Sequence, residues 1–170
     1  MRRKLVALMV IAAAALGSSA SPASASMAQP ESVAAAATTR LQNYASGKCL
    51  IVRGSATYTQ AVLYPCRTYS DQYWYFDSYQ GSNYFRLRNA KSNLCLVPAT
   101  NAPEAAVVQV PCITSATNQV WSWEPNSRGT FLRNYAYWSK CMFIRGSANE
   151  TGARIQHCSV NYSDQQWRKV

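Results

Sequence analysis

Along most of its length the chain alternates short apolar segments with polar turns. Segments such as Leu50–Val52, Ala61–Tyr64 and Trp74–Phe76 are rich in β-branched or aromatic side chains, and Gly, Ser, Asn and Pro separate them. Short runs of this kind are typical of β-strands. Beyond the N-terminus, no stretch has the apolar periodicity of a helix. The pattern therefore predicts an all-β fold.

The N-terminal segment differs from the rest of the chain. Three basic residues, Arg2 to Lys4, precede an apolar run from Leu5 to Leu16, and small residues in an A-x-A arrangement follow at Ala23–Ala25. This order is typical of a cleavable secretory signal peptide, which we assign to residues 1–25. The apolar run is too short to span a bilayer, which needs about 20 residues. We therefore expect a secreted, extracellular protein without a membrane span.

The next segment, residues 26–39, contains small residues and no aromatic side chain. We expect a flexible leader there and a folded domain over residues 40–170. With the three basic residues of the signal removed, 14 positive and 7 negative side chains remain, a net charge of +7. These charges are scattered, which is typical of a solvated surface, although attraction to an anionic surface such as acidic polysaccharide, lipid or nucleic acid is an alternative. No nucleic-acid-binding motif is present, so we expect no nucleic-acid partner.

The six cysteines recur at fixed distances. Two cysteines of a pair are 17 residues apart, and each pair begins 46 residues after the one before. The pairs are Cys49 and Cys66, Cys95 and Cys112, and Cys141 and Cys158. A fixed period of this size indicates a repeat architecture, with copies at about 40–84, 85–130 and 131–170. In an exported protein such cysteines indicate disulfides, and only pairing within each copy keeps the copies equivalent.

Two further elements keep the same period. An L-x-N element precedes each first cysteine, and a Q-x-W element lies near the end of each copy. We expect the three tryptophans to fill one layer of a shared core, because each copy supplies one large apolar ring. They are Trp74, Trp121 and Trp167. Four short strands per copy favour a closed barrel with hairpin caps, since closure removes exposed sheet edges.

The sequence offers no catalytic or metal-binding constellation. The single histidine, His157, stands where the other copies have Pro65 and Pro111, so we expect it in a surface turn. Asp71 and Asp164 are equivalent positions of two copies and should lie too far apart for a glycosidase pair, whose carboxyl groups are about 5–10 Å apart. The sequence contains no C-x-x-C element, which would be typical of a zinc site. We therefore expect no enzymatic activity, no cofactor and no metal.

The repeated elements resemble those of the ricin B-type lectin family. The resemblance rests on Cys49-Leu-Ile-Val-Arg-Gly, on the second cysteine of each copy and on the three Q-x-W elements, and it covers residues 40–170. It implies a β-trefoil made of three repeats of about four strands, with one disulfide in each. It also implies carbohydrate binding in shallow pockets, up to one per copy, without catalysis.

In that family a working pocket has an Asp two residues after the first cysteine, an aromatic ring two residues before the second, and Asn or Asp before Q-x-W. Copy by copy, these positions hold Ile51, Tyr64 and Asp71; Val97, Val110 and Asn118; and Phe143, Gln156 and Asp164. Every copy lacks the family carboxylate, and we expect the middle copy to have lost sugar binding. The first copy is the best candidate for a sugar site. Its residues are Tyr64, Asp71, Gln72 and Arg53.

Strand alternation offers a second interpretation of the same positions. If alternate residues after the first cysteine face the core, then Ile51 points outward, as do Phe143 and Arg145 in the third copy. An exposed apolar residue beside an arginine is typical of a protein contact, although a neighbouring loop could cover it. The sequence thus allows two functions. One is a lectin-like module with degenerate pockets that binds a glycan or polysaccharide, and the other is a protein-binding trefoil, such as a toxin-associated subunit or an inhibitor.

Overall fold

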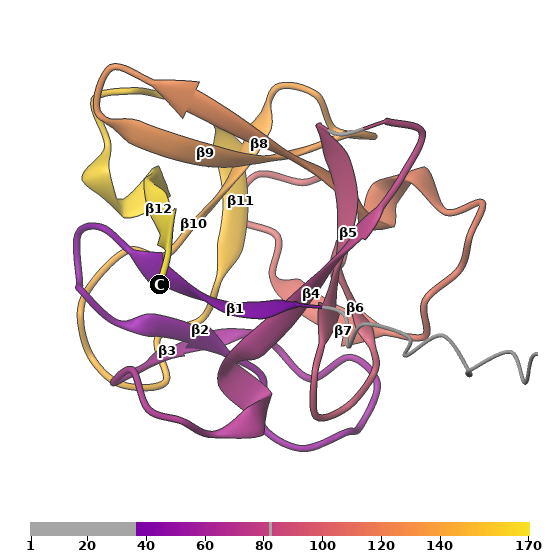
Figure 1. Ribbon diagram of the computed structural model, residues 1–170. Coiled ribbons are helices and arrows are strands. Elements are labelled where there is room, and N and C mark those ends of the chain that lie inside the picture. Colours follow the sequence, from indigo (N-terminus) through magenta and orange to yellow (C-terminus); the bar gives the residue numbers. More distant parts are fainter. Residues whose placement is uncertain (1–36, 82) are drawn as a thin grey trace, which may run out of the picture. The chain divides into compact units, whose positions relative to one another are not determined.

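The computed structural model describes residues 37–81 and 83–170, in which the chain forms twelve β-strands (Figure 1). The first copy contributes β1 (Thr38–Asn43), β2 (Cys49–Ile51), β3 (Val62–Tyr64) and β4 (Tyr73–Ser78). The second contributes β5 (Tyr84–Asn89), β6 (Cys95–Pro98), β7 (Val107–Val110) and β8 (Val120–Asn126). The third contributes β9 (Gly129–Asn134), β10 (Lys140–Phe143), β11 (Arg154–His157) and β12 (Trp167–Lys169). The predicted all-β fold with about four strands per copy is confirmed.

The first and last strands of the three copies form a closed six-stranded barrel. Antiparallel pairing runs from β1 to β4, β5, β8 and β9 in turn, and β12 pairs back with β1. A bridge between Phe131 and Gln166 completes the ring between β9 and the start of β12. In Figure 1, β12 and the C-terminus accordingly lie beside β1. The other six strands form the hairpins β2–β3, β6–β7 and β10–β11, which completes a β-trefoil.

The three hairpins meet through a closed triangle of backbone hydrogen bonds. The N–H of Ala61 donates to the carbonyl oxygen of Val107 at 2.9 Å, and that of Val107 donates to Ala153 at 2.9 Å. The N–H of Ala153 completes the triangle by donating to Ala61 at 2.7 Å. These residues are spaced by the 46-residue period, so equivalent positions of all three copies meet at one point. Each hairpin loop is therefore placed against the next copy.

A layer of three indole rings lies inside the fold. Trp74, Trp121 and Trp167 are exposed by 0%, 0% and 1% respectively and belong to one apolar cluster. Each Nε1–H donates to a backbone carbonyl of the hairpin of its own copy. The acceptors are Leu50 at 3.2 Å, Leu96 at 3.0 Å and Met142 at 3.1 Å. Each tryptophan thus contributes apolar burial and also satisfies its only donor.

Short 3-10 turns precede the last strand of each copy and carry the glutamine of the Q-x-W element. They are η1 (Ser70–Gln72), η2 (Thr117–Gln119) and η3 (Ser163–Gln165). The N–H after each second cysteine donates to the glutamine Oε1, at 2.7 to 2.9 Å. The glutamine Nε2 donates to the carbonyl before that cysteine, at 2.8 to 2.9 Å. The element therefore fixes the chain on both sides of the cysteine.

The predicted disulfide pairing is confirmed, with one bridge in each copy. The bonds join Cys49 to Cys66, Cys95 to Cys112, and Cys141 to Cys158, each with a Cα–Cα distance of 5.0 Å. In the chain-entropy model a loop of this length is worth about 3 kcal/mol. Short strands make few hydrogen bonds of their own, so a disulfide adds stability that each copy needs.

The N-terminal boundary differs slightly from the expected one. β1 begins at Thr38, which pairs with Tyr75 of β4, two residues before the expected domain start at Arg40. The predicted signal peptide, residues 1–25, and most of the predicted leader lie outside the described residues. None of the helical turns in residues 37–81 and 83–170 has the length and apolar character of a membrane-crossing helix.

Candidate functional site

The candidate sites lie on the outer face of each hairpin, opposite the indole layer. In the first copy Cys49 pairs with Tyr64 and Ile51 pairs with Val62, so these side chains share that face. The 3-10 turn brings the residue before Q-x-W to the same hairpin, since the N–H of Val52 donates to the Asp71 carbonyl at 3.4 Å. We call this arrangement the hairpin pocket of each copy. A fourth position, four residues after the first cysteine, decides how open it is.

In the first copy that position is Arg53, and it covers the pocket. The Arg53 guanidinium carbon lies 4.2 Å from the centroid of the Tyr64 ring. Its Nε is 2.9 Å from Oε1 of Glu150, which belongs to the third copy. This hydrogen bond raises the pKa of the Arg53 side chain above its ordinary value. Two of the predicted sugar ligands, Tyr64 and Arg53, therefore do lie together, but they bind each other.

Of the other two predicted ligands of the first copy, Asp71 is buried and Gln72 is fully engaged with the backbone. Asp71 is only 6% exposed, and its Oδ2 lies 3.8 Å from Nζ of Lys91. The amide of Gln72 is bonded at both ends to the backbone of Arg67 and Pro65. Gln72 therefore has no free hydrogen-bonding group for a sugar, whereas Oδ1 of Asp71 is buried without a hydrogen-bond partner.

The third copy is covered in the same way by Arg145. Its guanidinium carbon lies 5.1 Å from the Phe143 ring centroid, and its Nη2 donates to Oε1 of Gln156 at 3.1 Å. Its nitrogens also lie 3.5 Å from Asp164 and 3.7 Å from Glu104 of the middle copy. Burial raises the pKa of the Asp164 carboxyl above its ordinary value, and the Arg145 charge offsets this only in part.

The expected exposure of Ile51 and Phe143 is wrong. Their exposed fractions are 0% and 1%, whereas Arg145 is exposed as expected. Strand alternation does place Ile51 on the face opposite Leu50, which packs in the core. That face is not solvated, however, and a covering arginine is not required for this, because Val97, the equivalent residue beside Ala99, is only 6% exposed as well. Alternation within one strand gives the face of a side chain but not its exposed fraction, which depends on the segments packed against that face.

The middle copy has Ala99 at the covering position, and an open cleft of about 310 Å³ lies there. Most of its lining is apolar. It includes Val97, Ala99, Val110, Ile113, Asn118 and Tyr58. The small side chains that led us to expect no sugar binding in the middle copy thus leave the space that the arginines fill elsewhere. A site of this volume is at the lower end of the range of roughly 300–1,000 Å³ for small-molecule sites.

Tyr58 reaches this cleft from the first copy and was missed by the sequence analysis. It is 75% exposed and has a left-handed φ of 63°. Its equivalents, Glu104 and Glu150, have φ values of 62° and 64°. The N–H of Tyr58 donates to Gln109 of the middle copy at 2.7 Å. The loop that carries the ring is therefore fixed on the hairpin of the neighbouring copy.

A pairing rule links this loop position to the covering position. Each arginine forms an ion pair with a glutamate of the neighbouring copy on one side of the threefold axis. Arg53 of the first copy pairs with Glu150 of the third, and Arg145 of the third copy pairs with Glu104 of the middle one. Ala99 has Tyr58 in the corresponding place. When the three copies are aligned by the 46-residue period, the covering position reads Arg, Ala, Arg and the loop position reads Tyr, Glu, Glu. The periodicity contained the signal, but only the structure shows that the two positions meet across copies.

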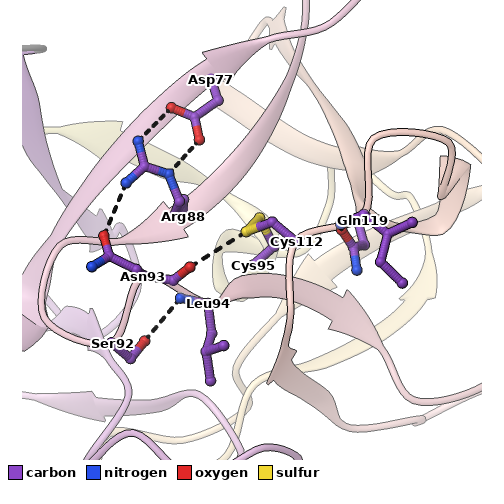
Figure 2. A network of polar contacts seen from close by, with 9 residues as sticks. Asp77, Arg88, Ser92, Asn93, Leu94, Cys95, Cys112 and Gln119 are labelled. Carbon is purple, nitrogen blue, oxygen red and sulfur yellow. Dashed lines mark hydrogen bonds and ion pairs between the residues drawn. A yellow bond between two sulfur atoms is a disulfide. The ribbon is translucent and has the colours of Figure 1, made fainter.

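Polar contacts around β5 hold the chain that leads into β6 (Figure 2). Arg88 donates to both carboxylate oxygens of Asp77, at 2.6 and 3.0 Å, and to the side chain of Asn93 at 3.0 Å. The hydrogen bond to Asp77 raises the pKa of the Arg88 guanidinium. The Asn93 carbonyl lies 3.5 Å from Sγ of Cys112, beside the disulfide. This side of the middle copy is therefore fixed before any ligand binds.

The sequence matches one family model over most of its length. The model is that of the ricin-type beta-trefoil lectin domain, and it matches residues 37–167. The comparison with curated protein sequences gave no match.

Solved structures share the fold at low sequence identity. A designed three-fold symmetric protein, ThreeFoil, is 21% identical with a TM-score of 0.72, over 78% of this chain and 97% of the other. The Rhizoctonia solani agglutinin is 22% identical with a TM-score of 0.70, over 84% and 99%. The C-half of an earthworm R-type lectin, solved in complex with GalNAc, is 15% identical with a TM-score of 0.57, over 78% and 96%. At these identities the likeness supports the fold alone.

Proposed function

The chain belongs to the ricin-type beta-trefoil lectin domain family, and from this we propose that it is a secreted, non-enzymatic carbohydrate-binding module whose open site is the cleft of the middle copy. The observation that carries the proposal is the difference between Ala99 and its two equivalents. Arg53 and Arg145 stack on aromatic rings in their own pockets, whereas Ala99 borders open space. The protein thus has three related pockets but one that needs no rearrangement to admit a ligand.

The chemistry of this cleft suits a sugar. Carbohydrate rings have apolar faces edged by hydroxyl groups, so a site for them combines an aromatic or aliphatic surface with a few hydrogen-bonding groups. Tyr58 and Val110 supply the apolar surface, and the Asn118 side chain supplies an amide. The similar structures named as an agglutinin and as a lectin bound to GalNAc support the same class of ligand.

The lining of the cleft supports binding without catalysis. It contains no histidine, carboxylate or cysteine that could act as a nucleophile or general base. Within the described residues, no cluster of side chains is suited to hold a metal ion. Export is supported by the order of residues 1–25 and by three disulfides, which form in oxidising compartments.

The alternative of a protein-binding trefoil loses its main support. It rested on the loss of the three pocket carboxylates and on exposed apolar side chains at Ile51 and Phe143, and both of these side chains are buried. We therefore propose no protein partner.

The experiment that tests the proposal is a glycan array with the oxidised protein, followed by titration of the best sugars. We expect binding with one site per chain. Ala99→Arg places in the middle copy the side chain that covers the other two, and it should abolish binding, whereas the small Ala99→Ser should retain it. An array and a panel of insoluble polysaccharides with no retained protein would exclude the carbohydrate-binding function.

A further inference from the structure

The middle cleft has an unusual lining for a sugar site, since it carries no charge. Its polar side chains are those of Tyr58, Asn118 and Gln119. The Gln119 amide is already bonded to the backbone, at 2.9 Å to the N–H of Ile113 and 2.8 Å to the carbonyl of Pro111. An uncharged wall matches an uncharged ligand, because a charged group placed there would lose its hydration without finding a partner. Asn118 and the Tyr58 phenol therefore remain to make polar contacts.

Val97 occupies the position where the family has its sugar-binding carboxylate. A sugar hydroxyl placed against Val97 and Val110 would give up water without gaining a hydrogen bond. A methyl group in the same place would be stabilised by its transfer from water. The two valines lie on the two strands of one hairpin, β6–β7, and Ile113 borders the same cleft. The wall therefore favours a methyl group over a hydroxyl group.

On the basis of the proposed function, we infer that the middle cleft selects sugars that carry a methyl group, either an acetamido substituent or a 6-deoxy carbon. The methyl group packs against Val97 and Val110, and the Asn118 amide binds the polar group next to it. The Tyr58 ring, supplied by the first copy, stacks on the apolar face of the sugar. The site therefore spans two copies.

The backbone at Tyr58 is held in place by the middle copy. Besides the backbone bond from Tyr58, the side chain of Gln109 donates to the carbonyls of Ala56 at 2.8 Å and Gly54 at 3.3 Å. These bonds fix the loop of the first copy on the middle copy at Tyr58 and at the residues before it. Because the backbone of this loop is already ordered, only the Tyr58 side chain has to lose freedom on binding, which favours affinity. An exposed tyrosine ring of this kind, at the edge of an apolar cleft, suits a stacked sugar.

The test compares sugars that differ only in the methyl-bearing group. N-acetylgalactosamine is titrated against galactose, and L-fucose against L-galactose, by calorimetry with the oxidised protein. In at least one pair we expect the methyl-bearing sugar to bind about fourfold more tightly or better, with one site per chain. The pair that shows the preference identifies the source of the methyl group. Equal or weaker binding of both methyl-bearing sugars would overturn the inference.

Two variants test the roles assigned to Tyr58 and Val97, and a third serves as the control. Tyr58→Ala should weaken every sugar by roughly tenfold, and Val97→Ser should remove the preference for the methyl group. Glu104→Ala changes the equivalent loop position of another copy and should leave binding as it is. Near-ultraviolet circular dichroism shows that each variant is folded. Unchanged selectivity in folded Val97→Ser, or unchanged affinity in folded Tyr58→Ala, contradicts the assigned roles.

The two proposals fail in different ways. If no sugar of any class binds, the carbohydrate-binding function itself is lost, and the selectivity with it. If sugars bind and Ala99→Arg abolishes binding, but no methyl preference appears, the proposed function stands and this inference falls.

Discussion

The guanidinium of Arg53 lies 4.2 Å above the ring of Tyr64 and is anchored to Glu150 of another copy at 2.9 Å. The tyrosine that makes the first copy the best sugar site by sequence is therefore covered by the protein itself. The same relationship holds between Arg145 and Phe143. Only at Ala99 does the covering side chain disappear.

Removing the arginine should uncover the first pocket. In Arg53→Ala, Tyr64 should become accessible, and its nitration by tetranitromethane, measured by mass spectrometry, should rise at least severalfold. The ion pair is exposed, so the free energy of unfolding should fall by less than about 1 kcal/mol. Glu150→Gln keeps the guanidinium and serves as the matched control, with a smaller rise. Unchanged nitration of Tyr64 in Arg53→Ala would show that something else covers the ring.

The glutamine of the Q-x-W element should matter for stability. Gln72→Leu has a similar size but leaves the N–H of Arg67 and the carbonyl of Pro65 without their partners. Both hydrogen bonds are only part-buried, so water can replace part of each, and we expect a loss of roughly 1–2 kcal/mol in urea unfolding. Gln119→Leu should cost a similar amount, because its contacts are equivalent. A stable Gln72→Leu protein that had lost sugar binding would instead make Gln72 a ligand.

The buried carboxyl of Asp164 predicts a dependence of stability on pH. Burial raises its pKa above the ordinary value of 3.8 in the folded protein. The protonated form therefore stabilises the fold below pH 3.8, and this contribution is lost as the pH rises through the folded-state pKa. At pH 7 the ionised group destabilises the protein, in spite of Arg145.

Asp164→Asn removes this ionisation and has a natural precedent in Asn118, the equivalent residue of the middle copy. The variant should be more stable than the original protein at pH 7, by an amount of the order of 1 kcal/mol. The difference should shrink at about pH 3, where the original carboxyl is protonated too. Urea unfolding at both pH values measures it. An advantage that grew on acidification would contradict the direction of the pKa shift.

A contact between two hairpin loops can be tested with a double-variant cycle. A Cβ at Gly152 would lie 2.6 Å from Cδ of Gln60. In Gly152→Ala the Gln60 amide must therefore move away and lose its bond to the Ala153 carbonyl, now 3.0 Å long. We expect a cost of about 1 kcal/mol in the free energy of unfolding. When Gln60→Ala is already present, adding Gly152→Ala should cost almost nothing, and purely additive costs would exclude the clash.

The repeat and the internal structure of each copy could be predicted from the sequence alone. The 46-residue period indicated the three disulfides, and the recurrence of Trp74 and its equivalents placed one indole per copy in the core. These features depend on residues that are near neighbours within one copy. A short-range pattern is sufficient to specify them, because each copy must build the same bridge and bury the same ring.

The open pocket, in contrast, could be identified only from contacts between copies. The cover of the first pocket depends on Arg53 and on Glu150, which are 97 positions apart in the chain. The open cleft likewise depends on Tyr58 of one copy and Ala99 of the next. Strand alternation gave the correct face for Ile51 but not its burial, since neighbouring segments can cover an outward face. The meeting of the three hairpins brings such pairs together, and a pattern within one copy cannot show which residues of another copy lie beside it.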